Sequence, residues 1–185
     1  GNTLEAADNY DRSGEIFVQP AALVEPGPAG EAARAAVAAK LPPKIKHFAP
    51  IGVHLGYHYE NSPIIVPDGT PPPAFDAARY SPTARPGHRA PHAWLARDRS
   101  TLDLFGRGFC LLRFADAPDT AGLRGAAEAA GVPLREVPLS EPAIAALYGR
   151  RLVLVRPDGH VAWRDDEAPA DPRGLIDIVR GATPQ

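Results

Sequence analysis

Four of the six histidines stand in two pairs, each with a spacing of four residues: His54 with His58, and His88 with His92. Two ligands at this spacing can share a zinc ion when they lie on a helix. Proline interrupts the second pair. The first pair is expected on a strand, where its side chains would stand about 13 Å apart at ~3.3 Å per residue. We therefore expect no metal site and interpret the histidines as polar anchors of extended segments.

Cys110 is the only cysteine, so an internal disulfide is excluded, and a reducing cytoplasmic location is expected. It lies in an apolar run typical of a buried strand, where a thiol usually serves as a small apolar residue. A thiol oxidoreductase instead needs its thiolate at the start of a helix, where the helix dipole lowers the thiol pKa. The residues that follow the run, Phe114 to Thr120, contain no cysteine. We expect Cys110 to belong to the core.

A basic, proline-flanked stretch offers a different use. Arg85, His88, Arg89 and His92 lie close together in it, and arginine pairs well with carboxylates and carbonyl groups. We interpret these four residues as a docking interface or, alternatively, as groups that pack within the domain. Trp94 is expected to pack inward in either case. The acidic run Asp165–Glu167 favours a solvated loop over a catalytic carboxylate pair, and no GxSxG nucleophile motif is present. We predict no catalytic, cofactor-binding or metal-binding residue.

Composition limits the class of protein. The 185 residues are 44% hydrophobic and carry a net charge of −2 without a basic block, so neither nucleic acid nor a membrane is an expected partner. The 22 prolines, about 12% of the chain against a usual ~5%, crowd between residues 63 and 91. The chain starts with Gly1 and lacks methionine, and we interpret it as a piece of a longer polypeptide.

Three zones follow along the chain. Residues 1–43 are predicted to be helical, with a first helix before Phe17, a break over Pro20–Pro28 and an alanine-rich helix over Ala29–Leu41. Residues 44–100 are predicted to contain a strand over 53–59, a second strand over 62–67 and a long proline-rich linker. Residues 101–185 are predicted to form a compact domain.

The third zone predicts an α/β fold with the element order β-α-β-α-β-β-α. Strands are expected over Gly108–Ala115 and Pro133–Leu139, and the sequence RLVLVRPDGHVAWR (Arg151–Arg164) predicts a hairpin that turns at Pro157–Gly159. Helices are expected from Asp119 or Thr120 to Ala130, from Glu141 to Tyr148, and from Asp171 to Arg180. This order resembles the thioredoxin fold without its CxxC motif. A crossover helix makes the first two strands parallel, and the hairpin adds an antiparallel edge.

Several motifs also resemble the C-terminal region of FAD-dependent aromatic-ring hydroxylases, the flavoprotein monooxygenases that act on phenols, hydroxyphenylpropionate and polyketides. They are PTARPGHRAPHAWL (Pro82–Leu95), STLDLFGRGFCLLR (Ser100–Arg113) and LYGRRLVLVRPDGHVAWR (Leu147–Arg164). LGYHYENSPIIVPDGTPPP (Leu55–Pro73) and the preceding PAGEAARAAVAAKLPPKIKHF (Pro28–Phe48) are similar to the segments that join such a tail to the flavin domain. The resemblance covers nearly all of the chain from Pro28 onward.

The resemblance implies a non-catalytic tail of thioredoxin fold, whose partner is the flavin-binding domain of its parent chain and which sometimes contributes to a homodimer. FAD and NAD(P)H are implied for the parent, which would hydroxylate a phenolic or polyketide ring with O₂. No FAD site carries over, because the GxGxxG phosphate loop is missing and Gly106-Arg107-Gly108 precedes a strand. Two alternatives stay open: a stand-alone binding or assembly module of the same fold, and a thiol oxidoreductase that uses Cys110.

Overall fold

A computed structural model describes residues 20–40 and 50–182 and divides the chain into two compact units, of which the first contains residues 20–40, 50–55 and 75–80. The predicted helix before Phe17 lies outside the described residues. The alanine-rich helix is confirmed as α3 (Pro28–Lys40). The predicted break over Pro20–Pro28 is partly wrong, because α2 (Pro20–Val24) occupies its first half. Proline is tolerated in the first turn of a helix, and the break itself is at Gly27, where φ is +84°.

The strand predicted over 53–59 is wrong: its first part is the short helix α5 (Ile51–Leu55). The Pro50 carbonyl accepts hydrogen bonds from the amides of Val53 and His54, which closes a helical turn at once. The Gly52 amide donates to the Ala77 carbonyl, and a Cβ at Gly52 would collide with backbone of residues 76 and 79. A contact so distant in sequence overrides the alternating pattern of side chains.

The second unit begins with an extended segment, residues 56–74 and 81–93, which we call the wrap. The strand predicted over 62–67 is wrong, since this stretch is a turn followed by irregular backbone. Asn61 lies in a turn and has a φ of 56°. The Val66 amide donates to the Ala162 carbonyl, and Ile65 is buried. The proline-rich backbone of the wrap thus lies on the surface of its own unit.

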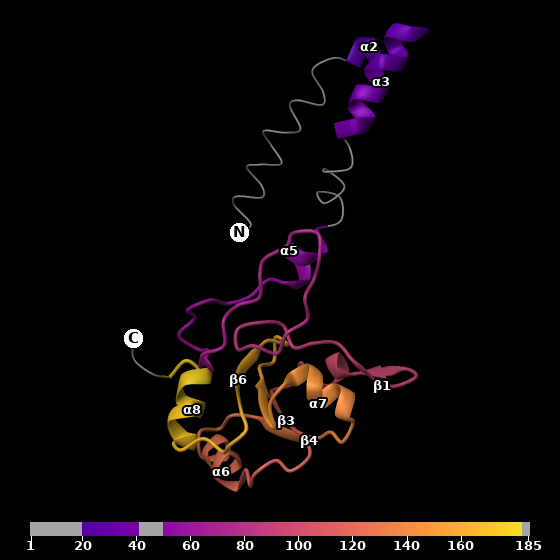
Figure 1. The fold of residues 1–185 in the computed structure, drawn as a ribbon. Coiled ribbons are helices and arrows are strands. Elements are labelled where there is room, and N and C mark those ends of the chain that lie inside the picture. The colour runs from indigo at the N-terminus through magenta and orange to yellow at the C-terminus, as the bar shows by residue number, and fades with distance from the viewer. Residues whose placement is uncertain (1–19, 41–49, 183–185) are drawn as a thin grey trace. The chain divides into compact units, whose positions relative to one another are not determined.

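A small hairpin that the sequence analysis did not predict follows the wrap. It consists of β1 (Trp94–Ala96) and β2 (Arg99–Ser100), which pair antiparallel. The 3₁₀ helix η2 (Thr101–Leu104) starts directly after it with a capping box, in which Ser100 and Asp103 satisfy each other's backbone amides. The hairpin extends away from the rest of the unit (Figure 1).

The core of the second unit confirms the predicted element order. The elements are β3 (Phe109–Arg113), α6 (Ala121–Ala129), β4 (Leu134–Pro138), α7 (Pro142–Tyr148), β5 (Leu152–Val155), β6 (Val161–Asp165) and α8 (Pro172–Val179). Within the described residues the main sheet has the strand order β4-β3-β5-β6. β3 and β4 are parallel, whereas β5 is antiparallel to both β3 and β6. The unit is therefore a mixed α/β domain with a mixed sheet.

The sheet lies between two hydrophobic clusters. Alternate β3 residues point to opposite faces, so Cys110 and Leu112 belong to one cluster and Leu111 belongs to the other. The first cluster includes Ile144 and Tyr148 of α7, and the second includes apolar residues of α6 and α8. Figure 1 shows α6 and α8 on one side of the sheet and α7 on the other. No helix in the described part of the chain is long and apolar enough to cross a lipid bilayer.

Candidate functional site

The carboxyl end of β3 is where a redox thiol was sought, and a pocket of about 500 Å³ opens there. Its lining includes Phe114, Asp116 and Ser140 but no cysteine. Cys110 lies inside β3 with 1% of its surface exposed, which confirms that it belongs to the core. Burial raises the pKa of the Cys110 thiol to about 11, against a smaller opposing effect of Arg135. At neutral pH the group is therefore a protonated thiol and a poor nucleophile.

An ionic cluster around Glu136 lies next to this pocket, because Arg113 belongs to both. Glu136 of β4 accepts a hydrogen bond from the Thr120 hydroxyl at 2.7 Å and pairs with Arg113 at 3.4 Å and Arg124 at 3.6 Å. Arg113 also donates to the carbonyl of Pro118 at 3.3 Å. These contacts fix the loop between β3 and α6, so the cluster has a structural use for all of its charges.

Two of the four predicted docking residues, Arg85 and His88, have their side-chain partners within the wrap. Arg85 forms a two-pronged ion pair with Glu60, with N–O distances of 2.9 and 3.0 Å, and its Nε donates to the Thr70 carbonyl at 2.8 Å. His88 is buried and stacks on His58 with a centroid distance of 4.3 Å. Burial, together with the charges of His58 and Arg85, lowers the pKa of His88 to about 4. His88 is therefore neutral at physiological pH.

The other two predicted docking residues, Arg89 and His92, are exposed. The expectation that Trp94 packs inward is wrong, because 65% of its surface is exposed. Trp94 lies on the projecting hairpin and makes an edge contact with the His92 ring at 4.8 Å. Trp163 of β6, in contrast, is buried in the second hydrophobic cluster. His92 and Trp94 form what we call the hairpin patch. Arg89 precedes the hairpin, and its backbone bridges to His160.

The sequence analysis missed the ion pair that fastens the wrap to the sheet. Arg164 of β6 donates to Asp68 at 2.7 Å, and both side chains are about nine-tenths buried. Arg164 also donates to the Tyr148 carbonyl at 3.0 Å and to the Thr70 hydroxyl at 3.3 Å. Burial alone would raise the pKa of Asp68, but hydrogen bonds from Thr70 and Arg164 lower it overall. The two ends of this pair are 96 residues apart, so no local sequence pattern announces it.

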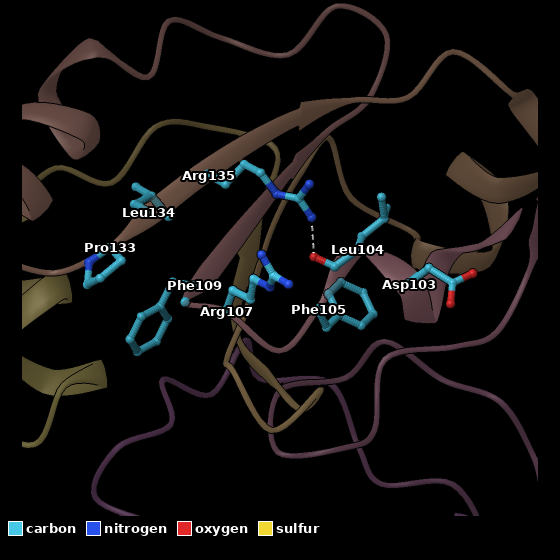
Figure 2. Close-up of a pocket in the computed structure, with 9 residues that line it drawn as sticks. Asp103, Leu104, Phe105, Arg107, Phe109, Pro133, Leu134 and Arg135 are labelled. Carbon is cyan, nitrogen blue, oxygen red and sulfur yellow. Dashed lines mark hydrogen bonds between the residues drawn. The ribbon is translucent and has the colours of Figure 1, made fainter.

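A second pocket, of about 580 Å³, lies at the opposite end of β3 and β4 and was also missed. Its walls include the rings of Phe105 and Phe109, and the guanidinium groups of Arg107 and Arg135 face it (Figure 2). Gly106 and Gly108 lead into β3 and do not connect a strand to a helix, so this stretch does not fit the phosphates of FAD. Among the described residues no group of three or more His, Cys, Asp or Glu is placed to hold a metal ion.

The fold and these contacts define an α/β domain whose chain wraps its own sheet. A family model described as the C-terminal domain of aromatic-ring hydroxylases matches residues 83–182, more than half of the chain. The chain therefore belongs to the aromatic-ring hydroxylase C-terminal family.

Relatives agree with this assignment. The chain is 40% identical over 129 residues to the FAD-dependent monooxygenase apdD of Emericella nidulans, covering 65% of this chain and 20% of that protein. It is 32% identical over 186 residues to a phenol 2-monooxygenase of Pseudomonas sp. strain EST1001, covering 89% and 30%. The structure of the rebeccamycin biosynthetic enzyme RebC with reduced flavin is 45% identical and superposes with a TM-score of 0.84, covering 97% and 33%. The chain thus spans about a fifth to a third of the length of these proteins.

Proposed function

We propose that this chain is the non-catalytic, thioredoxin-like C-terminal part of a cytoplasmic FAD-dependent aromatic hydroxylase, and that it docks on the flavin-binding part of its parent. Membership of the hydroxylase C-terminal family is the observation that carries the proposal. The thioredoxin-like assignment is supported by the strand order β4-β3-β5-β6, with its one parallel pair followed by an antiparallel hairpin. A non-redox role is supported by the buried, protonated thiol of Cys110.

The parent reaction would replace a ring C–H bond of a phenolic or polyketide substrate by C–OH. One atom of O₂ enters the ring and the other leaves as water, with two electrons from NAD(P)H delivered through the flavin. The relatives' names support FAD and an aromatic substrate: they include a phenol 2-monooxygenase and an aklavinone-11 hydroxylase in complex with FAD and aklavinone. The residues described here supply none of that chemistry and act by holding the parent together.

The hairpin patch is the proposed contact with the flavin-binding part. Tryptophan is one of the residue types that dominate binding energy at protein interfaces, and Trp94 is exposed with its ring against that of His92. Most of each relative lies outside the region matched by this chain. We propose that the corresponding part of the parent, which would contain the flavin, binds to the hairpin patch. A second copy of the chain, giving a homodimer, is the competing occupant.

A binding experiment tests this role. The purified chain should be colourless, and it should bind the separately expressed flavin-containing part of its parent in titration calorimetry. Trp94→Ala should weaken that binding about tenfold or more, as removal of an interface anchor does. Arg173→Ala, at an exposed site on α8, is the control and should bind like the wild type. A chain that retains flavin, or a Trp94→Ala variant that binds normally, would contradict the proposal, and a loss of self-association in Trp94→Ala would favour the homodimer.

Labelling of Cys110 distinguishes a thiol oxidoreductase from the proposed non-redox role. Because the folded thiol is buried and has a pKa of about 11, iodoacetamide should modify it far more slowly in the native chain than in urea. Fast modification of the native chain, together with disulfide-reductase activity that Cys110→Ala abolishes, would support the oxidoreductase.

A further inference from the structure

The pocket of Figure 2 combines features that point to a small ligand. Its volume of about 580 Å³ falls in the range of small-molecule sites, roughly 300–1,000 Å³. It lies where the amino ends of β3 and β4 meet the chain that follows η2. The hairpin patch does not line it, so its use is independent of the proposed docking role.

Its electrostatics favour an anion. Arg107 and Arg135 both line the pocket, and among the described residues neither has an ion-pair partner. Arg135 donates a hydrogen bond to the Leu104 carbonyl and also interacts with the Cys110 thiol. These contacts orient its guanidinium group, which has five N–H donors and so keeps others for a ligand. Asp103 is the one acidic residue of the lining, but its carboxylate accepts the Ser100 amide and points away from both guanidinium groups (Figure 2).

The walls of the pocket favour an anionic ligand that also carries a flat, apolar group. Phe105 and Phe109 are half-buried and line the pocket together with Pro133 and Leu134. Phenyl rings offer faces and edges to another aromatic ring, and a guanidinium plane can stack on one as well. Gly108, with φ +148°, brings its backbone against Pro133, where a Cβ would lie 2.8 Å from the Pro133 carbonyl oxygen. The shape of this wall therefore depends on that glycine.

We infer that the pocket between η2, β3 and β4 binds a small aromatic carboxylate, whose anionic group is held by Arg107 and Arg135 and whose ring lies against Phe105 and Phe109. The two arginines supply the planar, two-pronged donors that carboxylates prefer. Such a site would bind an aromatic acid without transforming it.

Benzoate is the probe for this site, tested on the full chain by titration calorimetry and by NMR shifts. Benzoate should bind saturably, and Arg107→Gln should weaken it about tenfold, the effect of one charge-assisted hydrogen bond. Benzamide, which has the same shape without charge, should bind at least about tenfold more weakly because it loses the charge-assisted hydrogen bonds. Acetate should also bind at least about tenfold more weakly, because it keeps the charge but loses the ring that lies against the two phenylalanines. Added salt should weaken benzoate binding as well.

Arg97→Gln is the matched control, because Arg97 is an exposed arginine on the projecting hairpin and does not line the pocket. It should bind benzoate like the wild type. Arg107 is exposed, so its replacement should leave the fold intact, which circular dichroism checks. The inference is overturned if the wild type shows no saturable benzoate binding, if Arg107→Gln binds as well as Arg97→Gln, or if benzamide binds as tightly as benzoate.

Discussion

At the scale of single residues, Arg164 connects segments that are far apart in the sequence. It reaches Asp68 and Thr70 in the wrap and the carbonyl of Tyr148 at the end of α7, so it joins three parts of the chain. Breaking a buried ion pair by removing one partner is costly because the other charge stays buried. The position thus tests whether the wrap is fastened by this pair.

Arg164→Ala should lower the free energy of unfolding by about 3 kcal/mol, because it leaves the Asp68 carboxylate without its main cation. Urea unfolding followed by circular dichroism measures this. Arg173→Ala removes an exposed arginine that pairs with Asp177 within α8, and its unfolding midpoint should stay unchanged. Equal midpoints for the two variants would show that the wrap is held by other contacts.

His88 makes the stability depend on pH. Its pKa is about 4 in the folded chain and near 6.5 when unfolded, so the unfolded chain takes up a proton that the folded chain does not. The contribution of neutral His88 is therefore complete above pH 6.5 and is lost as the pH falls from 6.5 toward 4. His88→Gln should flatten the decline of the unfolding midpoint over this interval, and an unchanged decline would refute the assignment.

At the scale of elements, the wrap depends on close backbone contact. Gly87 has a φ of +89°, and a Cβ there would lie 2.7 Å from the Tyr59 carbonyl, whose residue donates its amide to Gly87. Gly125, in contrast, lies on the exposed side of α6 with open space around it. The two glycines therefore offer opposite tests of the same substitution.

Gly87→Ala should destabilise the chain by roughly 1–3 kcal/mol, because the new methyl group meets backbone in a strained conformation. Gly125→Ala should stabilise it by about 0.5–1 kcal/mol, because alanine loses less backbone freedom in a helix. Thermal unfolding of both variants checks the pair. A Gly87→Ala variant as stable as the wild type would mean that the wrap is not closely packed.

The elements from β3 to α8 were predictable because each one carries its own signals. α8 begins at Asp171, whose side chain caps the helix, and the hairpin turns at Gly159 with φ +80°. The region before residue 100 was less predictable because its conformation is set by distant partners. Alternating apolar residues suggested a strand over 53–59, yet the bonds of Pro50 and Ala77 produce α5 instead. Trp94 was misplaced for a related reason: β1 and β2 pair only with each other and give it no core to enter.

The features of the candidate sites also differ in how far they could be predicted from local sequence. The missing thiol after β3 and the buried position of Cys110 were readable from local sequence alone. The internal use of Arg85 depends on Glu60, which is 25 residues away, and the pocket of Figure 2 depends on residues from two separate stretches. No periodicity or spacing rule contains such pairings, so one chain without its structure cannot supply them.

At the scale of the whole molecule, the wrap decides where the C-terminal unit really starts. β6 is the last strand of its sheet, and the chain supplies its missing neighbour: Val66 donates to Ala162, Gly87 donates to Val161, and Val161 donates to His88. A polypeptide trimmed to residues 83–182 would discard one of these three hydrogen bonds, that of Val66, together with Asp68. Light scattering should then reveal more self-association than in the 185-residue chain, because an uncovered strand edge recruits strands from other molecules. A shorter version of this unit for crystallisation or fusion should therefore begin before residue 56. The part of the wrap that precedes residue 83 lies outside the family match, yet it helps to cover the edge of β6.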